Sequence, residues 1–257
     1  MIPDMAVFVK RRDPPKPGSI PEALRMFENE VRFYREVAPA IGVRVPECHQ
    51  SEHGDEGTLL VLEDLSSWRE GADPVAAAVL LAQMHRRWEG AASQRWPWLR
   101  ASTAAVDLVV ALYDESWPRV ADRVDCTAAV RSLGDRLAGR VGDVERDAAA
   151  AGPDTLVHGD ASMRNLRTSP FGEVALLDWE DVGSAPGIGD VAWLMVSSVQ
   201  PDRWDDVLAA YGSEAGLLDV LPSIAVQGVL SFADTDPESD EALGWVCRLE
   251  AAASRLA

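Results

Sequence analysis

The chain has 257 residues, of which 47% are hydrophobic and 26% charged, a composition typical of a folded globular protein with one large domain or two modest ones. Its 24 basic and 42 acidic residues give a formal net charge of −18, which argues against nucleic-acid binding because phosphate backbones attract dense lysine and arginine. No apolar run is long enough to span a bilayer and no signal sequence opens the chain, so we expect a cytoplasmic protein with no membrane partner.

The first quarter of the chain carries the patterns of a small α+β unit. Apolar runs predict three strands, at residues 5–10, 43–46 and 58–62. Helical spacing of apolar residues predicts one helix over 21–38. The polar segment 51–57 contains glycine and predicts the turn between the last two strands. We expect these two strands to pair in an antiparallel sheet.

The remainder of the chain is predicted to be mostly helical. Asp73 and Pro74 form a typical helix start, and Gly90 follows the end of that helix. Further helices are predicted at residues 101–116, 118–150 (with Pro118 as the break), 187–199, 201–212, 215–232 and 237–256. The predicted fold class is therefore α+β with two lobes, a small sheet-plus-helix lobe over 1–65 and a larger helical lobe over 66–257. A ligand is expected between the lobes.

The most informative segment lies inside the second lobe. An apolar strand leads into His158-Gly159-Asp160, Asn165 follows five residues after the aspartate, and a second apolar strand delivers Asp178. Phosphoryl transfer needs a base beside the acceptor hydroxyl and hard oxygen ligands for Mg²⁺. Asp160 is the predicted catalytic base, and Asn165 and Asp178 are the predicted Mg²⁺ ligands.

At these residues the chain resembles the aminoglycoside phosphotransferase and choline kinase family, which is related to the protein kinases. The signature of that family is H-G-D-x-x-x-x-N followed by an apolar strand that ends in aspartate, often as D-W-E, and Asp178-Trp179-Glu180 matches this ending. The resemblance implies a two-lobed protein-kinase-like fold, ATP as a cofactor together with Mg²⁺, and a small-molecule hydroxyl as acceptor. It also implies that His158 supports the loop.

The resemblance extends to the nucleotide side of the site. Lys10 ends a short apolar strand, and it matches the family lysine that binds the ATP phosphates and pairs with a helix glutamate, here Glu30, with Glu28 as a weaker alternative. The segment Glu63-Asp64-Leu65 resembles the connector whose backbone binds the adenine, so Glu63 and Leu65 are predicted cofactor-binding residues. Asp190 resembles a structural aspartate that braces the catalytic loop.

Two features depart from the pattern. His53-Gly54-Asp55 repeats the first three letters of the signature, but Leu60 stands where asparagine is needed, so we interpret it as a surface turn. The family lobe normally begins with two more strands and a loop over the ATP phosphates, and the sequence before Lys10 has no room for them. The true start lies upstream, or the protein is a short form with a weaker hold on ATP, or it has lost catalysis.

Because the base and both metal ligands are present, we expect an active ATP- and Mg²⁺-dependent phosphotransferase. Its acceptor is expected to be a hydroxyl of a small molecule such as an aminoglycoside-like antibiotic, an amino alcohol, a sugar or another metabolite. Two alternatives are a kinase of peptide serine and threonine in natural-product maturation, and a pseudokinase-like binding module. The sequence does not identify the acceptor or the oligomeric state.

Overall fold

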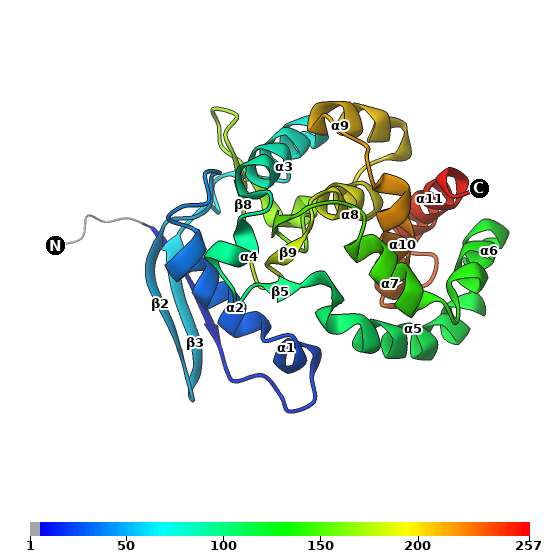
Figure 1. The fold of residues 1–257 in the computed structure, drawn as a ribbon, viewed down its shortest axis with the longest axis horizontal. Helices are drawn as coiled ribbons and strands as arrows, with labels where there is room; N and C mark the ends of the chain where they lie inside the picture. The colour runs from blue at the N-terminus through cyan, green and yellow to red at the C-terminus, as the bar shows by residue number, and fades with distance from the viewer. Residues whose placement is uncertain (1–5) are drawn as a thin grey trace.

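A computed structural model describes residues 6–257, with a small sheet at one end of the molecule and a mostly helical part at the other (Figure 1). The sheet is antiparallel, with the strand order β1-β3-β2, and consists of β1 (Val7–Arg12), β2 (Cys48–Gly54) and β3 (Gly57–Glu63). Alternate residues of the central strand β3 are buried, including Leu60 and Leu62, as expected where one face of a sheet packs on a core. Met5, where the first strand was expected to begin, lies outside the described residues.

The helix predicted over residues 21–38 is wrong in its continuity. The segment forms α1 (Ile20–Ala23), α2 (Met26–Arg32) and a π-helical turn (Phe33–Val37). Arg25 separates α1 from α2 because its φ of +54° is left-handed and cannot continue a right-handed helix. The result places Glu30 on the buried side of α2.

The second strand of the sheet was predicted too early. Residues 43–46 form no strand, and β2 occupies Cys48–Gly54, so that the turn shrinks from the predicted 51–57 to Asp55 and Glu56. β2 is an edge strand with mostly exposed polar residues, and it therefore lacks the apolar alternation on which the prediction relied. His53, Gly54 and Asp55 are exposed, as expected for the second H-G-D.

The helical part contains the predicted helices with two corrections. The first is that residues 118–150 form the end of one helix and two further helices, with non-helical residues between them. Its helices are α3 (Pro74–Trp88), α4 (Ala92–Arg95), α5 (Val106–Ala121), α6 (Ala128–Leu137), α7 (Val141–Ala149), α8 (Ile188–Ser198), α9 (Trp204–Tyr211), α10 (Leu217–Ala233) and α11 (Asp240–Arg255). Pro118 lies inside α5 and does not end it, because Trp117 and Val120 on either side are buried and hold the segment against the core. The predicted cap at Asp73 is present and accepts the Val75 amide.

Two short sheets hold the central loop of the helical part. Strand β6 (Asp154–Val157) pairs with β9 (Gly183–Pro186), which also pairs with β5 (Arg100–Ala101). Strand β7 (Leu166–Thr168) lies between β4 (Arg69–Glu70) and β8 (Val174–Leu176). The segment with the H-G-D motif runs from β6 to β7, and the segment with Asp178 runs from β8 to β9, so the two meet beside each other.

A buried aromatic contact joins the sheet end of the molecule to these segments. Trp179 is fully buried and stacks on Phe33 with 4.0 Å between ring centroids, while His158 packs 4.4 Å from the same indole. Because Trp179 is next to Asp178, this stack fixes the position of Asp178 relative to α2. None of the helices within residues 6–257 combines the length and the hydropathy that crossing a membrane requires.

Candidate active site

A cavity of about 310 Å³ lies between the three-stranded sheet and the two central segments. All six residues that the sequence predicted for the nucleotide and the metal line it, namely Lys10, Glu30, Glu63, Leu65, Asn165 and Asp178. Phe8, Tyr34, Leu62 and Leu177 give it apolar walls, and Arg164 and Arg167 add positive charge. A cavity with apolar walls and convergent charged groups is typical of a cofactor site.

Lys10 is the centre of the charged groups in this cavity. Its ammonium donates to Glu30 Oε1 at 2.8 Å and to Asp178 Oδ1 at 2.5 Å. The predicted pair of Lys10 and Glu30 is therefore present, and the alternative partner Glu28 instead pairs with Arg25 on the surface. A strand, a helix and a distant loop thus meet at one cation.

The two carboxylates that Lys10 binds, those of Glu30 and Asp178, have pKa values shifted in opposite directions. Burial raises the pKa of Glu30, and the Lys10 charge only partly opposes this effect because the Glu30 side chain is 3% exposed. Burial also acts to raise the pKa of Asp178, but the Lys10 charge and hydrogen bond outweigh it and hold the pKa of Asp178 below its usual range. Asp178 is therefore an anion in the neutral pH range.

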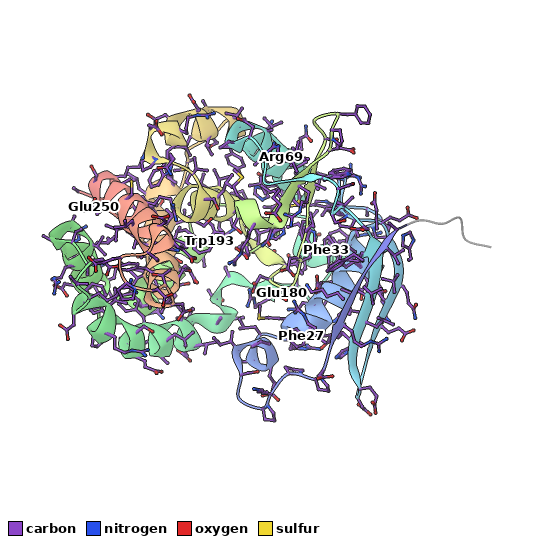
Figure 2. All side chains as sticks on the ribbon, turned by 180° about the vertical axis from the view of Figure 1, so that it is seen from behind. Phe27, Phe33, Arg69, Glu180, Trp193 and Glu250 are labelled. Atoms are coloured by element: carbon purple, nitrogen blue, oxygen red, sulfur yellow. The ribbon has the colours of Figure 1, made fainter. Side chains whose placement is uncertain are left out.

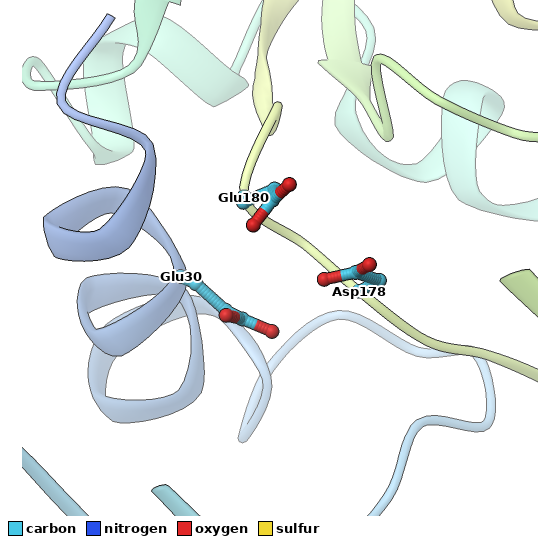
Figure 3. A group of neighbouring side chains, drawn as sticks. All are labelled: Glu30, Asp178 and Glu180. Carbon is cyan, nitrogen blue, oxygen red and sulfur yellow. The ribbon is translucent and has the colours of Figure 1, made fainter. Parts of the chain in front are cut away.

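Asp178 has an unusual backbone conformation. Its φ of +63° lies in the left-handed region, which costs free energy for a residue other than glycine and is concentrated at functional sites. Figure 3 shows Glu30 on its helix facing Asp178 and Glu180 on the opposite loop, with carboxylate oxygens of all three within 4.8 Å of one another. Arg12 pairs with Glu180, so Lys10 and Arg12 together neutralise most of this negative charge.

Asp160 accepts hydrogen bonds on both carboxylate oxygens. Trp193 Nε1 donates to Oδ1 at 2.7 Å, while Asn165 Nδ2 and an Arg164 guanidinium nitrogen each donate to Oδ2 at 2.8 Å. Asn165 Nδ2 also donates to the backbone oxygen of Asp160 at 2.9 Å, which closes the loop between the two residues. The predicted base and the predicted metal ligand are therefore in direct contact.

His158 connects the two central segments. The Asp160 amide donates to its Nδ1 at 3.2 Å, so Nε2 carries the hydrogen and donates to the carbonyl of Leu177 at 2.8 Å. Because Leu177 precedes Asp178, this buried imidazole fixes the spacing between the segments that carry Asp160 and Asp178. The role that the resemblance implied for His158 agrees with these contacts.

Asp190 at the start of α8 holds the backbone of the H-G-D segment. Its carboxylate accepts the amides of His158 at 2.7 Å and Gly159 at 3.0 Å, and it lies 3.2 Å from His85 Nε2. Burial acts to raise the pKa of Asp190, but the hydrogen bonds and the nearby imidazoles hold this pKa below its usual value. The predicted brace is confirmed by these contacts.

The connector at residues 63–65 lines the far end of the cavity. The Glu63 carboxylate is bound by Arg44 at 2.5 and 2.6 Å and by the Glu47 amide at 3.1 Å. Burial acts to raise the pKa of Glu63, but the Arg44 hydrogen bonds lower it overall. The side chain of Glu63 is thus engaged away from a ligand, and its backbone amide donates to the Glu47 carbonyl at 2.8 Å.

Comparison with known proteins decides the family. The profile described as the phosphotransferase enzyme family matches residues 6–225, which is most of the chain. The chain belongs to this family. No protein of curated function matches this phosphotransferase family member significantly in sequence.

Solved structures of related proteins have the same fold. Choline kinase LicA from Streptococcus pneumoniae is 18% identical, with a TM-score of 0.60 over 99% of this chain and 88% of that one. A choline/ethanolamine kinase family protein from Mesorhizobium loti is 17% identical, with a TM-score of 0.56 over 95% and 82%. Spectinomycin phosphotransferase APH(9)-Ia is 10% identical, with a TM-score of 0.58 over 97% and 86%. This family member therefore has the two-lobed, protein-kinase-like α+β fold that the sequence predicted.

The oxygen donors in the cavity of this phosphotransferase family member fit Mg²⁺. Asn165 uses its amide nitrogen on Asp160, which leaves its amide oxygen as the free hard ligand. Asp178 is a carboxylate held anionic by Lys10, and both residues line the same cavity. Amide and carboxylate oxygens are the ligands that Mg²⁺ prefers, so the predicted pair suits the metal.

Three residues of the site were missed from the sequence. Arg12 pairs with Glu180, which is 168 positions away in the sequence. Trp193, labelled in Figure 2, reaches Asp160 from α8. Arg164 carried a signal that could have been used, since it lies inside the H-G-D-x-x-x-x-N segment four residues after the base. The other two depend on tertiary contacts that no local pattern encodes.

Proposed function

We propose that this protein is an ATP- and Mg²⁺-dependent phosphotransferase that moves the terminal phosphate of ATP to a hydroxyl group of a small molecule. The observation that carries this proposal is a cavity lined by Lys10, Asn165 and Asp178, with Asp160 just outside its lining and hydrogen-bonded to Asn165. Phosphoryl transfer requires positioning and charge neutralisation more than covalent chemistry, and these four side chains supply both.

In this proposal the nucleotide lies in the cavity between the lobes 1–65 and 66–257. The adenine lies against the connector, where Glu63 and Leu65 line the cavity, and the phosphates extend toward Lys10. Lys10 is held by both Glu30 and Asp178 at the cavity wall, so its ammonium is fixed where the phosphates are proposed to lie. Nucleotide use is supported by related structures, because LicA was solved with AMP and spectinomycin phosphotransferase with ADP.

Asp160 is proposed as the base for the acceptor hydroxyl. Its carboxylate is oriented on one oxygen by Trp193 and on the other by Asn165, so it is held in a fixed position to accept the proton of a hydroxyl bound beside it. Asn165 and Asp178 are proposed to hold Mg²⁺, which would neutralise negative charge on the phosphates during transfer.

A small molecule is the proposed acceptor, and its class is the open part of the proposal. The related structures include enzymes named for choline and for spectinomycin, so amino alcohols and antibiotics of the aminoglycoside type belong in the first test. Fold alone does not choose between these and sugars or other metabolites.

The test is turnover of the purified protein with ATP and Mg²⁺ against a panel of aminoglycosides, amino alcohols, sugars and serine- or threonine-containing peptides. ADP release that depends on the acceptor, together with a new phosphomonoester signal in the phosphorus NMR spectrum, supports the proposal. Transfer only to peptides makes the protein a peptide kinase. Nucleotide binding without transfer to any acceptor makes it a binding module and contradicts the proposal.

A further inference from the structure

Arg164 occupies a position that the proposed mechanism has not used. It lies in the 3₁₀ turn Met163–Asn165 and places a guanidinium nitrogen 2.8 Å from Asp160 Oδ2. The same residue lines the nucleotide cavity together with Lys10 and Asp178. Arg164 therefore connects the proposed base with the place proposed for the phosphates.

Arg164 is the most loosely held of the three donors on Asp160. Its side chain is 74% exposed, whereas Asn165 is buried and Trp193 is half-buried in α8. An exposed ion pair is worth only about 0–1 kcal/mol, because water screens the charges and both side chains lose freedom. A stronger anion close by is thus enough to draw Arg164 away from Asp160, while Asn165 and Trp193 keep the carboxylate oriented.

The proposed reaction brings such an anion to this position. The hydroxyl that Asp160 activates must lie within hydrogen-bond distance of its carboxylate and must also face the terminal phosphorus in line. A guanidinium that already touches Asp160 is therefore within reach of the oxygens on that phosphorus. A guanidinium fork also matches two phosphate oxygens better than an ammonium does.

The other cationic side chains near the cavity are already engaged and do not take the role of binding the terminal phosphate. Lys10 is shared between Glu30 and Asp178, and Arg12 is paired with Glu180. Among residues 6–257, Arg164 and Arg167 are the arginines that line the cavity, and Arg167 is engaged with the carbonyls of Arg164 and Leu166 and with Glu70. The guanidinium of Arg164 is itself exposed, its partner Asp160 keeps two other donors, and it can exchange that carboxylate for a phosphate.

We infer that Arg164 leaves Asp160 when a nucleoside triphosphate binds and pairs with its terminal phosphate. This inference rests on the proposed function, and it gives Arg164 two states. Without the triphosphate, Arg164 covers Oδ2 of the base. With the triphosphate, Arg164 binds the group to be transferred and frees Oδ2 to accept the proton of the acceptor hydroxyl, so the base becomes available only when the phosphate donor is in place.

The experiment compares the binding of ADP with that of a non-hydrolysable ATP analogue, both with Mg²⁺, by isothermal titration calorimetry. Arg164→Ala is expected to weaken binding of the analogue about 10-fold, the size expected for loss of a charge-assisted hydrogen bond, and to leave ADP affinity unchanged. Arg164→Lys keeps the charge without the fork and is expected to give an intermediate loss. Arg119→Ala is the matched control, because Arg119 also forms an exposed i,i+4 ion pair but on α5.

The outcomes separate this inference from the proposed function. If the unchanged protein binds neither nucleotide, the proposed function fails and this inference fails with it. If the unchanged protein binds both but Arg164→Ala weakens ADP and the analogue equally, or weakens neither, only the assignment of Arg164 to the terminal phosphate is overturned. Where an acceptor is known, Arg164→Ala is expected to lower kcat while KM for the acceptor stays unchanged.

Discussion

The indole of Trp193 donates a 2.7 Å hydrogen bond to Oδ1 of Asp160. Trp193 lies three residues after Asp190 on α8, and Asp190 accepts the amides of His158 and Gly159. Residues three apart lie on the same face of a helix, so a single turn of α8 holds both the backbone and the carboxylate of the proposed base. The orientation of Asp160 is therefore set by a rigid helix and does not depend on its loop alone.

Trp193→Phe removes this hydrogen bond and keeps an aromatic ring in place. Hydrogen bonds to charged groups contribute about 1.5–3 kcal/mol, so we expect kcat to fall about 10- to 100-fold with little change in nucleotide affinity. The matched control is Trp98→Phe, which removes an indole hydrogen bond to Glu36 away from the cavity. Steady-state kinetics on both variants check the prediction, and equal losses in the two variants would contradict it.

Asp160→Asn tests the base itself. The amide is nearly the same size as the carboxylate but cannot accept the hydroxyl proton, and general base catalysis contributes about 10²- to 10⁴-fold. We expect kcat to fall by that factor while nucleotide binding and the thermal midpoint stay close to those of the unchanged protein. Asp143→Asn, which alters an exposed ion pair with Arg146, serves as the control. Full activity of Asp160→Asn would show that another group accepts the proton.

Lys10→Met tests the charged centre of the cavity. Removing one partner of a buried ion pair costs about 3–5 kcal/mol, because it leaves Glu30 buried without its cation. We expect a clear loss of stability in urea unfolding together with a loss of nucleotide binding. The double variant Lys10→Met with Glu30→Gln is expected to recover much of the stability but not nucleotide binding, since it removes the buried charge at position 30 but does not restore the ammonium that the phosphates need. Recovery of both properties would remove Lys10 from the nucleotide site.

Asp190 gives the stability of the protein a dependence on acidic pH. Because its folded pKa lies below the ordinary aspartate value of 3.8, its carboxylate adds stability that is fully present above that value. This contribution is lost as the pH falls from 3.8 through the lower folded pKa. We expect Asp190→Asn to be less stable at pH 7, with a smaller loss of stability on acidification below 3.8. Urea unfolding at several pH values measures both, and parallel curves for the two proteins would contradict the prediction.

The parts of the site that lie within one local segment were predictable from the sequence. The H-G-D-x-x-x-x-N spacing predicts that Asp160 and Asn165 face each other, and the apolar strand before Asp178 predicts where that residue emerges. The pairing of Lys10 with Glu30 followed from family resemblance, because sequence spacing alone does not bring residues 10 and 30 together.

The rest of the site depends on tertiary contacts. Arg12 and Glu180 are 168 positions apart in the sequence, so no local pattern pairs them. Nothing in the sequence distinguishes Trp193 from the other eight tryptophans. The strand β2 was misplaced because an exposed edge strand has no apolar alternation, and the left-handed turn at Arg25 has no glycine to mark it. Local patterns report burial, so exposed elements and long-range pairs were the parts that they missed.

Gly159 has a left-handed backbone conformation, and the neighbouring segment leaves no room for a side chain there. Its φ is +84°, and a Cβ there would lie 2.3 Å from the carbonyl oxygen of Asp181. Gly172 has a similar φ of +88° with no atom within 4 Å of its Cβ position, so Gly172→Ala adds the strain without the clash. We expect Gly159→Ala to displace Asp160, with kcat reduced about 100-fold, since a shift of about 1 Å at a reacting group has an effect of that size. Gly172→Ala is expected to lose only about 1 kcal/mol of stability and to keep its kcat. Kinetics and urea unfolding on both variants decide the matter, because equal kinetic losses would show that Asp181 does not limit the loop.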